Sequence, residues 1–411
     1  MNPRRVLVAD GGPPSALAVA RSLVRAGWRV EATRSAAGDR APRSRGVVLV
    51  DAPSPARDPA GFVGAILRAG AAGGRGVLIP ATDAAIVAVE ARREEVESVW
   101  DIALPPSEVV ARVQDKGLTL AAARAAGVRV PRGRVVRPGE EGEDPGSGPP
   151  WVLKPVRSRW AGVGGVVRGG GPSFARTREE LRERLAPYFA DGAPGVLVQE
   201  FVPGTGWGVG LWMRGRGPDQ PVPDGLQTST RPDMRVGSRV HTLEPGAVFV
   251  HRRLREVYPA GGPSAAAVAE APDPAVVDPA VALLREIGWE GLAMVEFRRD
   301  GSGEPVLMEV NGRPWGTLGL AVDAGVDFPR LLLEGGDGPP PTYRVGMKRR
   351  WFAGDVRRIG AAWAGAPPGF PGVFPSPLAA LGTALLSWSP DLVFRWSDPG
   401  PFLGELRGAL S

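Results

Sequence analysis

The N-terminal part of the chain alternates short apolar runs with amphipathic stretches. Residues 14–26 and 59–69 place apolar side chains at helical spacing. Four runs have the length and composition of buried parallel strands: 5–9, 28–32, 47–51 and 76–80. Strands that alternate with helices in this way predict a parallel α/β domain, which ends near residue 105 at a Leu-Pro-Pro turn.

After residue 105 the order of elements is less regular. Helical patterns occupy 107–115, 116–126, 177–187, 275–287, 317–323 and 328–334. Strand patterns occupy 151–154, 165–168, 196–201, 207–213, 247–253, 291–299 and 304–311. Two segments lack a period: a linker at 137–150 that looks disordered, and a polar stretch at 215–246 that we interpret as a loop or flap. The tail, 342–411, holds a basic strand and short apolar pieces.

Composition excludes several kinds of site. The chain has 411 residues, 43% of them hydrophobic and 23% charged, as in globular proteins of two or three domains. Because it has no cysteine, disulfides, thiolate metal sites and a cysteine nucleophile are excluded. Its two histidines, His241 and His251, argue against a histidine-rich metal site or a histidine-based triad.

The charge pattern does not favour nucleic acid. Although the net charge is +6, the arginines are interleaved with acidic residues and accompany no aromatic-basic module. No apolar leader precedes the first strand, and no apolar run is long enough to span a bilayer. We therefore expect a cytoplasmic protein that binds neither nucleic acid nor membranes.

The rarity of lysine draws attention to two positions. Only three of the 50 basic residues are lysines. Lys116 precedes a helical stretch in Gln-Asp-Lys-Gly, and Lys154 ends a strand-like run in Trp-Val-Leu-Lys-Pro. A compact ammonium group suits a phosphate oxygen in a tight site, whereas a surface charge is the alternative for each. Lys348 has no assigned role.

Paired carboxylates stand in the two strands at 291–299 and 304–311, which a turn at 300–303 joins. Each apolar strand carries one carboxylate, Glu296 or Glu309, and Asn311 follows two residues after the second. Strand alternation puts Glu309 and Asn311 on one face. These oxygens suit Mg²⁺ bound together with substrate phosphates, although each acid could instead face solvent.

Three glycine or capping signals carry less information. The turn at Gly11 and Gly12 lacks the spacing of a dinucleotide loop, so a structural turn is favoured. Thr82 and Asp83 follow a strand and could face a ligand, but the start of a helix is favoured. The loop at 158–165 is glycine-rich, but such turns are frequent in this chain.

The sequence resembles the ATP-grasp superfamily, in particular its carbamoyl-phosphate-synthase-like branch of carboxylate–amine ligases. The resemblance covers roughly residues 5–335 and is most specific in the run Met-Glu-Val-Asn-Gly-Arg-Pro-Trp-Gly that begins at Met308. The other matching segments are Asp115-Lys116, 127–131, Lys154-Pro155, 199–204 and 251–256 with Gly261-Gly262. The resemblance implies an α/β pre-ATP-grasp domain (1–105), then a two-lobed ATP-grasp domain (106–198 and 199–340) and a C-terminal extension (341–411).

The resemblance also implies residue roles. Gln199, Glu200, Phe201 and Val202 would form the hinge that binds adenine. Lys116 and Lys154 would neutralise phosphates, and a loop with Ser158, Gly162, Gly164 and Gly165 would close over them. Glu296, Glu309 and Asn311 would hold one or two Mg²⁺, with Mn²⁺ as a substitute. Arg253 and Arg313 would meet negative charge on the transferred phosphoryl group, although a structural salt bridge is the alternative for Arg253.

The implied function is ATP-dependent amide formation from a carboxylate and an amine through an acyl phosphate, with release of ADP and phosphate. An ATP-dependent carboxylase or carbamoyl-phosphate-type enzyme and a non-catalytic nucleotide-binding regulator remain alternatives. The sequence names neither small-molecule substrate. It leaves the oligomeric state open, with a homodimer among the options.

Overall fold

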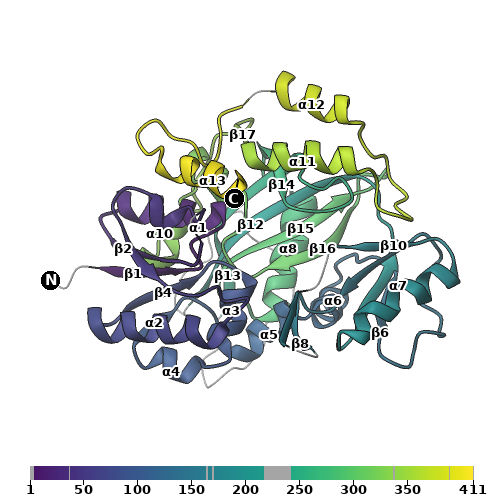
Figure 1. Ribbon diagram of the computed structural model, residues 1–411, viewed down its shortest axis with the longest axis horizontal. Helices are drawn as coiled ribbons and strands as arrows, with labels where there is room; N and C mark the ends of the chain where they lie inside the picture. Colours follow the sequence, from purple (N-terminus) through teal and green to yellow (C-terminus); the bar gives the residue numbers. More distant parts are fainter. Residues whose placement is uncertain are drawn as a thin grey trace.

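The N-terminal domain is a five-stranded parallel sheet with helices on both faces, which confirms the predicted parallel α/β fold and adds a fifth strand. The computed structural model describes residues 4–36, 38–162, 165–168, 171–216, 242–336, 338–387 and 389–410 (Figure 1). The strand order is β3-β2-β1-β4-β5. The strands are β1 (Arg5–Ala9), β2 (Arg29–Arg34), β3 (Val47–Asp51), β4 (Gly76–Pro80) and β5 (Trp100–Ile102). The helices are α1 (Pro14–Arg25), η1 (Ala41–Arg43), α2 (Pro59–Gly73), α3 (Asp83–Glu90) and α4 (Arg93–Glu97).

A four-stranded antiparallel sheet follows. Two helices precede it, α5 (Ser107–Gln114) and α6 (Lys116–Ala125). Its order is β10-β7-β11-β6, from β6 (Gly133–Val136), β7 (Trp151–Pro155), β10 (Ser173–Ala175) and β11 (Val196–Glu200). Helix α7 (Arg178–Ala190) packs Leu181 and Leu185 on the face that carries Trp151 and Leu153. The linker predicted at 137–150 contains neither helix nor strand.

The second large sheet has six antiparallel strands in the order β16-β15-β12-β13-β14-β17. They are β12 (Thr205–Arg216), β13 (Thr242–Glu256), β14 (Ser264–Glu270), β15 (Gly291–Arg299), β16 (Pro305–Asn311) and β17 (Lys348–Arg350). Helices α5, α6 and α8 (Pro274–Ile287) cover one face. Helices α9 (Leu318–Ala324) and α10 (Phe328–Glu334) join the other face to α1. Strands β12 and β13 are longer than predicted, and 217–241, most of the predicted flap, lies outside the described residues.

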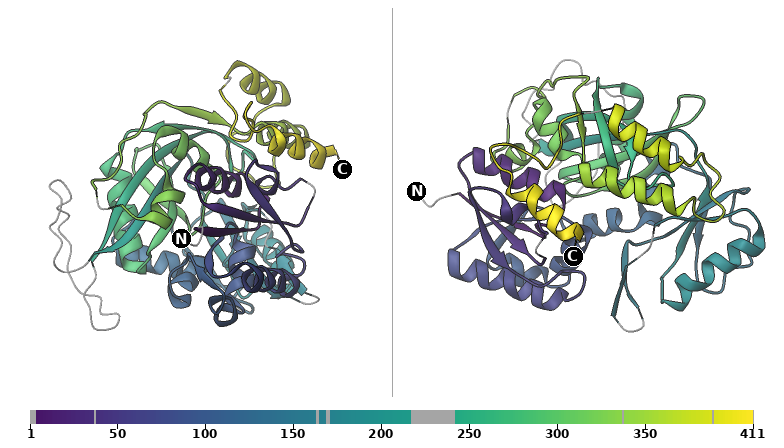
Figure 2. Two further views of the ribbon diagram at one scale, coloured as in Figure 1. Left: turned by 90° about the vertical axis from the view of Figure 1, so that its left-hand side faces the viewer. Right: turned by 45° about the horizontal axis from the view of Figure 1, so that its top comes forward.

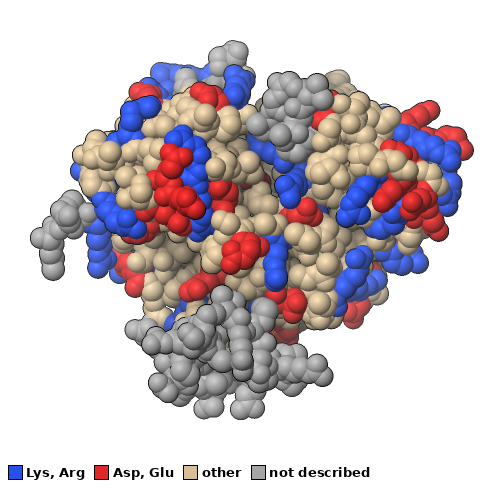
Figure 3. Space-filling view, turned by 90° about the horizontal axis from the view of Figure 1, so that it is seen from below, with Lys and Arg blue, Asp and Glu red and all other residues tan. Residues whose placement is uncertain are grey.

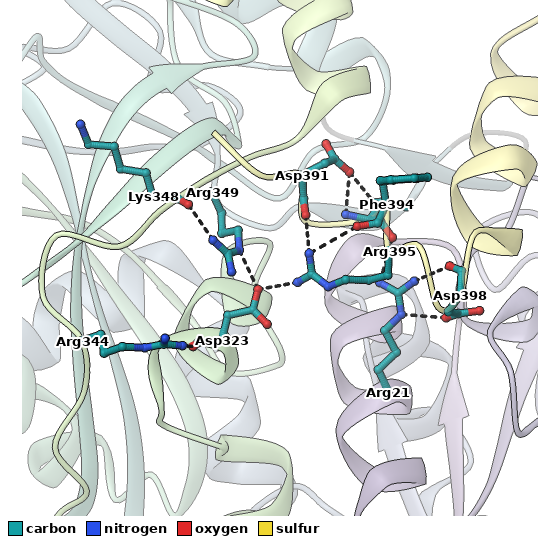
Figure 4. A network of polar contacts seen from close by, with 10 residues as sticks. Arg21, Asp323, Arg344, Lys348, Arg349, Asp391, Phe394, Arg395 and Asp398 are labelled. Carbon is teal, nitrogen blue, oxygen red and sulfur yellow. Dashed lines mark hydrogen bonds and ion pairs between the residues drawn. The ribbon is translucent and has the colours of Figure 1, made fainter. Parts of the chain in front are cut away.

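The C-terminal extension packs across the six-stranded sheet and the N-terminal domain (Figure 2). Its helices are α11 (Phe352–Ala364), α12 (Pro377–Leu386) and α13 (Gly400–Leu410). Figure 4 shows one anchor: Arg349 and Arg395 both pair with Asp323 of α9, the former at 2.7 Å. Arg21 of α1 pairs with Asp398 at 2.9 Å. The extension is therefore tied to two other parts of the molecule.

The surface agrees with a chain of mixed charge. On the face shown in Figure 3, basic and acidic side chains are interspersed. Of the helices that the structure describes, none has the length and apolar character needed to cross a membrane. The domain boundaries at 105, 198 and 340 stay predictions.

Candidate active site

The two predicted metal carboxylates face each other across neighbouring strands. In the register of β15 and β16, Glu296 lies opposite Glu309, and Met294 lies opposite Asn311. The Asn311 Nδ2 donates a hydrogen bond to Glu296 Oε1 at 3.2 Å. The register shifts just after Glu296, which places Met308 in a bulge. The structure thus brings all three predicted residues together, and their metal-binding role stays a prediction.

Glu296 is also part of an ion-pair network. Arg253 of β13 places Nη2 at 2.6 Å from Glu296 Oε2 and Nη1 at 3.4 Å from Glu256. Arg298 in turn donates to both Glu256 oxygens at 3.1 Å. Burial alone would lower the pKa of Arg253, but the charges of Glu296 and Glu256 outweigh it and raise that pKa. Arg253 is therefore held in a salt bridge, the alternative that the sequence left open, beside the predicted metal residues.

Alternate glycines in β12 make room for the side chains of this face. A Cβ at Gly208 would lie 2.2 Å from the His251 ring, and one at Gly206 would lie 2.7 Å from the Arg253 stem. A Cβ at Gly210 would lie 2.4 Å from Trp315. Since successive strand residues point to opposite faces, glycines two apart clear one face. Arg253 can therefore cross β12 and reach Glu296.

Arg313 links the carboxylate strand to the N-terminal domain. Its Nε and Nη2 donate to the two oxygens of Asp83 at 2.8 and 3.0 Å, and Nη2 also donates to Asn311 Oδ1 at 3.0 Å. Burial would raise the pKa of Asp83, but the Arg313 charge lowers it overall. Thr82 caps α3 as predicted, because its side chain accepts from the Ala85 N–H. The sequence did not indicate that Asp83 fixes Arg313.

The two predicted phosphate lysines approach the carboxylates from the four-stranded sheet and α6. Lys154 is half-buried on β7, and burial lowers its pKa while the Glu309 charge opposes that shift. Lys116 starts α6, with Nζ at 3.5 Å from Ser158 Oγ. Lys116, Ser158 and Glu309 line one pocket. The basic and acidic groups therefore border one site.

The glycine-rich segment is a hairpin rather than an irregular loop. Strands β8 (Arg159–Gly162) and β9 (Gly165–Arg168) pair in antiparallel fashion, and Gly162 pairs with Gly165 at the turn. Gly164 lies outside the described residues. Whether this hairpin covers phosphates stays a prediction.

Two residues of the predicted hinge already form hydrogen bonds within the protein. The Phe201 N–H donates to Pro150 O at 3.1 Å, so this donor is not free for a base. Both Glu200 oxygens accept from Arg132, at 2.9 and 2.8 Å. Burial raises the pKa of Glu200, but its bonds with Arg132 lower it overall. Gln199 and Val202 are buried, and their roles remain predictions.

The donor set of the strand pair fits Mg²⁺. Two carboxylates and one amide supply only oxygen ligands, which a hard divalent cation prefers. Among the described residues no group of three or more His, Asp or Glu side chains could hold a metal ion. The remaining ligands would therefore come from substrate phosphates or water, as is usual for Mg²⁺.

His251 is the buried residue of this face to which no role was assigned. It is 1% exposed, lies opposite Gly208, and shares a hydrogen bond of 3.0 Å between Nε2 and Thr317 Oγ1. Burial lowers the pKa of His251 to about 3. It is therefore neutral at physiological pH. Arg298, also missed, lies two residues after Glu296, so strand alternation could have found it.

Comparisons with known proteins give a partial family match and a similar fold. Residues 252–352 match the family described as "ATP-grasp in the biosynthetic pathway with Ter operon". A sequence search of curated proteins finds no significant match.

Three solved structures illustrate the similarity in fold. L-amino acid ligase from Bacillus licheniformis has a TM-score of 0.55 and 17% identity, with 83% of this chain and 75% of that chain covered. Biotin carboxylase from Campylobacter jejuni has a TM-score of 0.57 and 14% identity, with 84% and 74% covered. N5-carboxyaminoimidazole ribonucleotide synthetase from Thermus thermophilus has a TM-score of 0.54 and 19% identity, with 84% and 81% covered. Residues 252–352 therefore match an ATP-grasp family, in line with the resemblance seen in the sequence, and the fold of the chain is similar to the folds of these three enzymes.

Proposed function

We propose that the protein is an ATP-dependent carboxylate–amine ligase that forms an amide through an acyl phosphate. One observation carries the proposal: Lys154 of the four-stranded sheet borders the pair of Glu296 and Glu309 on the six-stranded sheet. Ammonium and carboxylate groups on opposite walls suit a Mg²⁺-bound polyphosphate, which needs both kinds of partner. The fold similarity to ligases supports the same reaction class.

Each residue would act through charge and position. Lys116 and Lys154 would neutralise phosphate oxygens of ATP. Glu296, Glu309 and Asn311 would hold one or two Mg²⁺, which when bound offset the charge between the β- and γ-phosphates. Arg313, which Asp83 holds beside Asn311, would face charge that develops on the transferred group. Arg253 would keep Glu296 oriented.

The reaction then needs no covalent bond to the protein. A carboxylate oxygen attacks the γ-phosphorus and ADP leaves, which gives an acyl phosphate. The amine nitrogen attacks the acyl carbon, phosphate leaves with the electron pair of the broken C–O bond, and the nitrogen loses a proton. Positioning and electrostatic stabilisation supply the rate enhancement. The absence of cysteine is consistent with this route.

A second candidate is an ATP-dependent carboxylase, in which bicarbonate is the acid that becomes phosphorylated. The fold similarity to biotin carboxylase favours including it. The two candidates share the first chemical step and differ in the acid. In both, the substrates are small molecules, and we propose the cytoplasm as the compartment.

A coupled ADP-release screen over acids and amines tests the proposal, with bicarbonate as a separate arm. Stimulation by one acid together with one amine supports the ligase, and stimulation by bicarbonate supports the carboxylase. Glu309→Gln should reduce release at least about 100-fold, because it removes a carboxylate from the proposed Mg²⁺ site. Equal rates in the variant and the parent would refute the metal assignment. No release with any pair would favour a non-catalytic nucleotide-binding protein.

A further inference from the structure

The segment between α11 and α12 reaches the hinge. Arg176, just after β10, donates from Nη2 to Phe370 O at 2.9 Å and from Nε to Gly369 O at 3.3 Å. The Phe370 ring meets the Phe174 ring edge-on, with centroids 5.1 Å apart, and the Phe201 ring with centroids 5.9 Å apart. The C-terminal extension thus contacts a strand of the four-stranded sheet and the hinge together.

This contact lies on the face of the sheet that carries Lys154. Val152 precedes Lys154 by two residues on β7, so their side chains share a face. Val152 lies opposite Phe174 on one side and Gln199 on the other. Val152, Phe174 and Phe370 form one buried apolar cluster, with Phe201 at its edge. Trp151 and Leu153 point to the other face, where α7 covers them.

The distance along β7 between Lys154 and the aromatic cluster matches the length of a nucleoside. Two strand residues span about 7 Å, so the cluster begins about one nucleoside length from the ammonium group. The base is the flat, weakly polar part of ATP, and aromatic side chains pack against the faces of bases. The phosphates would meet the lysine, and the base would lie toward the hinge beside the aromatic rings.

We propose that Phe370, from the C-terminal extension, is a nucleotide-binding residue that forms an apolar wall at the base end of the proposed ATP site. Phe174 and Phe370 are in direct contact and both are buried, so the base does not pass between them and lies against the rim of the cluster, where Phe201 is only half-buried. The proposal rests on the proposed function, because it requires that ATP binds with its phosphates at Lys154. It makes residues 367–374 part of the nucleotide site, although they lie beyond the predicted two-lobed domain.

Binding of a nonhydrolysable ATP analogue to the full-length protein tests this, by calorimetry in the presence of Mg²⁺. Phe370→Ala should raise the dissociation constant about tenfold, the effect of losing one stacking side chain. Phe370→Leu should recover part of the loss. Inorganic tripolyphosphate should bind the parent and Phe370→Ala equally, since it has no base.

Phe402→Ala is the matched control. Phe402 belongs to the same extension and meets Phe352 and Phe394, away from the hinge. It should leave analogue binding unchanged. If Phe370→Ala and Phe402→Ala raise the constant equally, general loosening of the extension explains the loss and the proposal fails. Unchanged or tighter binding by Phe370→Ala also overturns it, and tighter binding would mean that the ring blocks the slot. A parent protein that binds no analogue would overturn the proposed function as well.

Discussion

Replacement of Gly208 by alanine should destabilise the six-stranded sheet through one identified clash. The added Cβ would lie 2.2 Å from His251 Cε1, and real Cβ contacts essentially never fall below 3.0 Å. His251 is 1% exposed, so the ring has no solvent to move into. Moving it would break its hydrogen bond with Thr317. Overpacking costs about 1–3 kcal/mol and a lost hydrogen bond about 1 kcal/mol, so we expect a loss of about 2–4 kcal/mol.

Urea unfolding followed by tryptophan fluorescence measures the loss in the parent and in a His251→Ala background. Without the imidazole ring, the new methyl group enters the space that the ring occupied. The cost of Gly208→Ala should then fall below about 1 kcal/mol, which gives a large coupling energy between the two sites. Gly360→Ala is the control, since its Cβ meets nothing within 4 Å and lies in α11. It should stabilise by about 0.5–1 kcal/mol.

The reasoning is refuted if Gly208→Ala costs the same in both backgrounds. An equal cost would mean that the backbone of β12, rather than the His251 ring, rejects the methyl group. A cost below about 0.5 kcal/mol in the parent would show that the ring moves freely, against its burial and its bond to Thr317.

Three further predictions concern pH, the extension and the carboxylate pair. Since burial lowers the pKa of His251 to about 3, the unfolded chain binds one more proton between about pH 3 and 6.5, and stability falls with acidification over that window. His251→Gln should reduce this slope by up to about 1.4 kcal/mol per pH unit, measured by urea unfolding from pH 4 to 7. Asp355→Asn leaves Arg255 without its buried partner, so it should lower the free energy of unfolding by about 3 kcal/mol and increase proteolysis of the extension. Asp51→Asn breaks only an exposed pair and should have neither effect. Glu309→Gln should stay within about 0.5 kcal/mol of the parent in thermal unfolding, because it changes a half-buried group without a close ion pair.

The sequence predicted the elements whose signals are local. β1, β3, β4, β15 and α10 have the predicted bounds, because each is a short apolar or amphipathic run between turn residues. Strand β5 was missed, since three residues are too short to show a period. Helix α4 was missed and only the start of α3 was predicted, because short helices give few periodic positions.

Contacts between distant parts of the chain could not be predicted in the same way. Asp83 and Arg313 are separated by 230 residues, and only the packing of α3 against the end of β16 brings them together. Phe370 lies in a proline- and glycine-rich stretch that has no periodic signal. In both cases the local sequence does not indicate the distant partner. The three-dimensional arrangement, rather than the residue type, gives these side chains their partners.

Glu296 and Glu309 have the same sequence pattern but different surroundings in the structure. Glu296 and Glu309 look equivalent in the sequence, and like charges directly opposite on neighbouring strands repel. The structure makes them different: Glu296 pairs with Arg253 at 2.6 Å, while Glu309 has no ion pair within 4 Å among the described residues. Loss of the Glu296 charge leaves a largely buried guanidinium without its partner and costs stability, so a fall in activity there mixes two causes. Loss of the Glu309 charge breaks no such ion pair; it removes the repulsion from Glu296 and also a charge that favours the ammonium form of Lys154. If Glu309→Gln keeps the stability of the parent, a fall in its activity reports on the site rather than on folding.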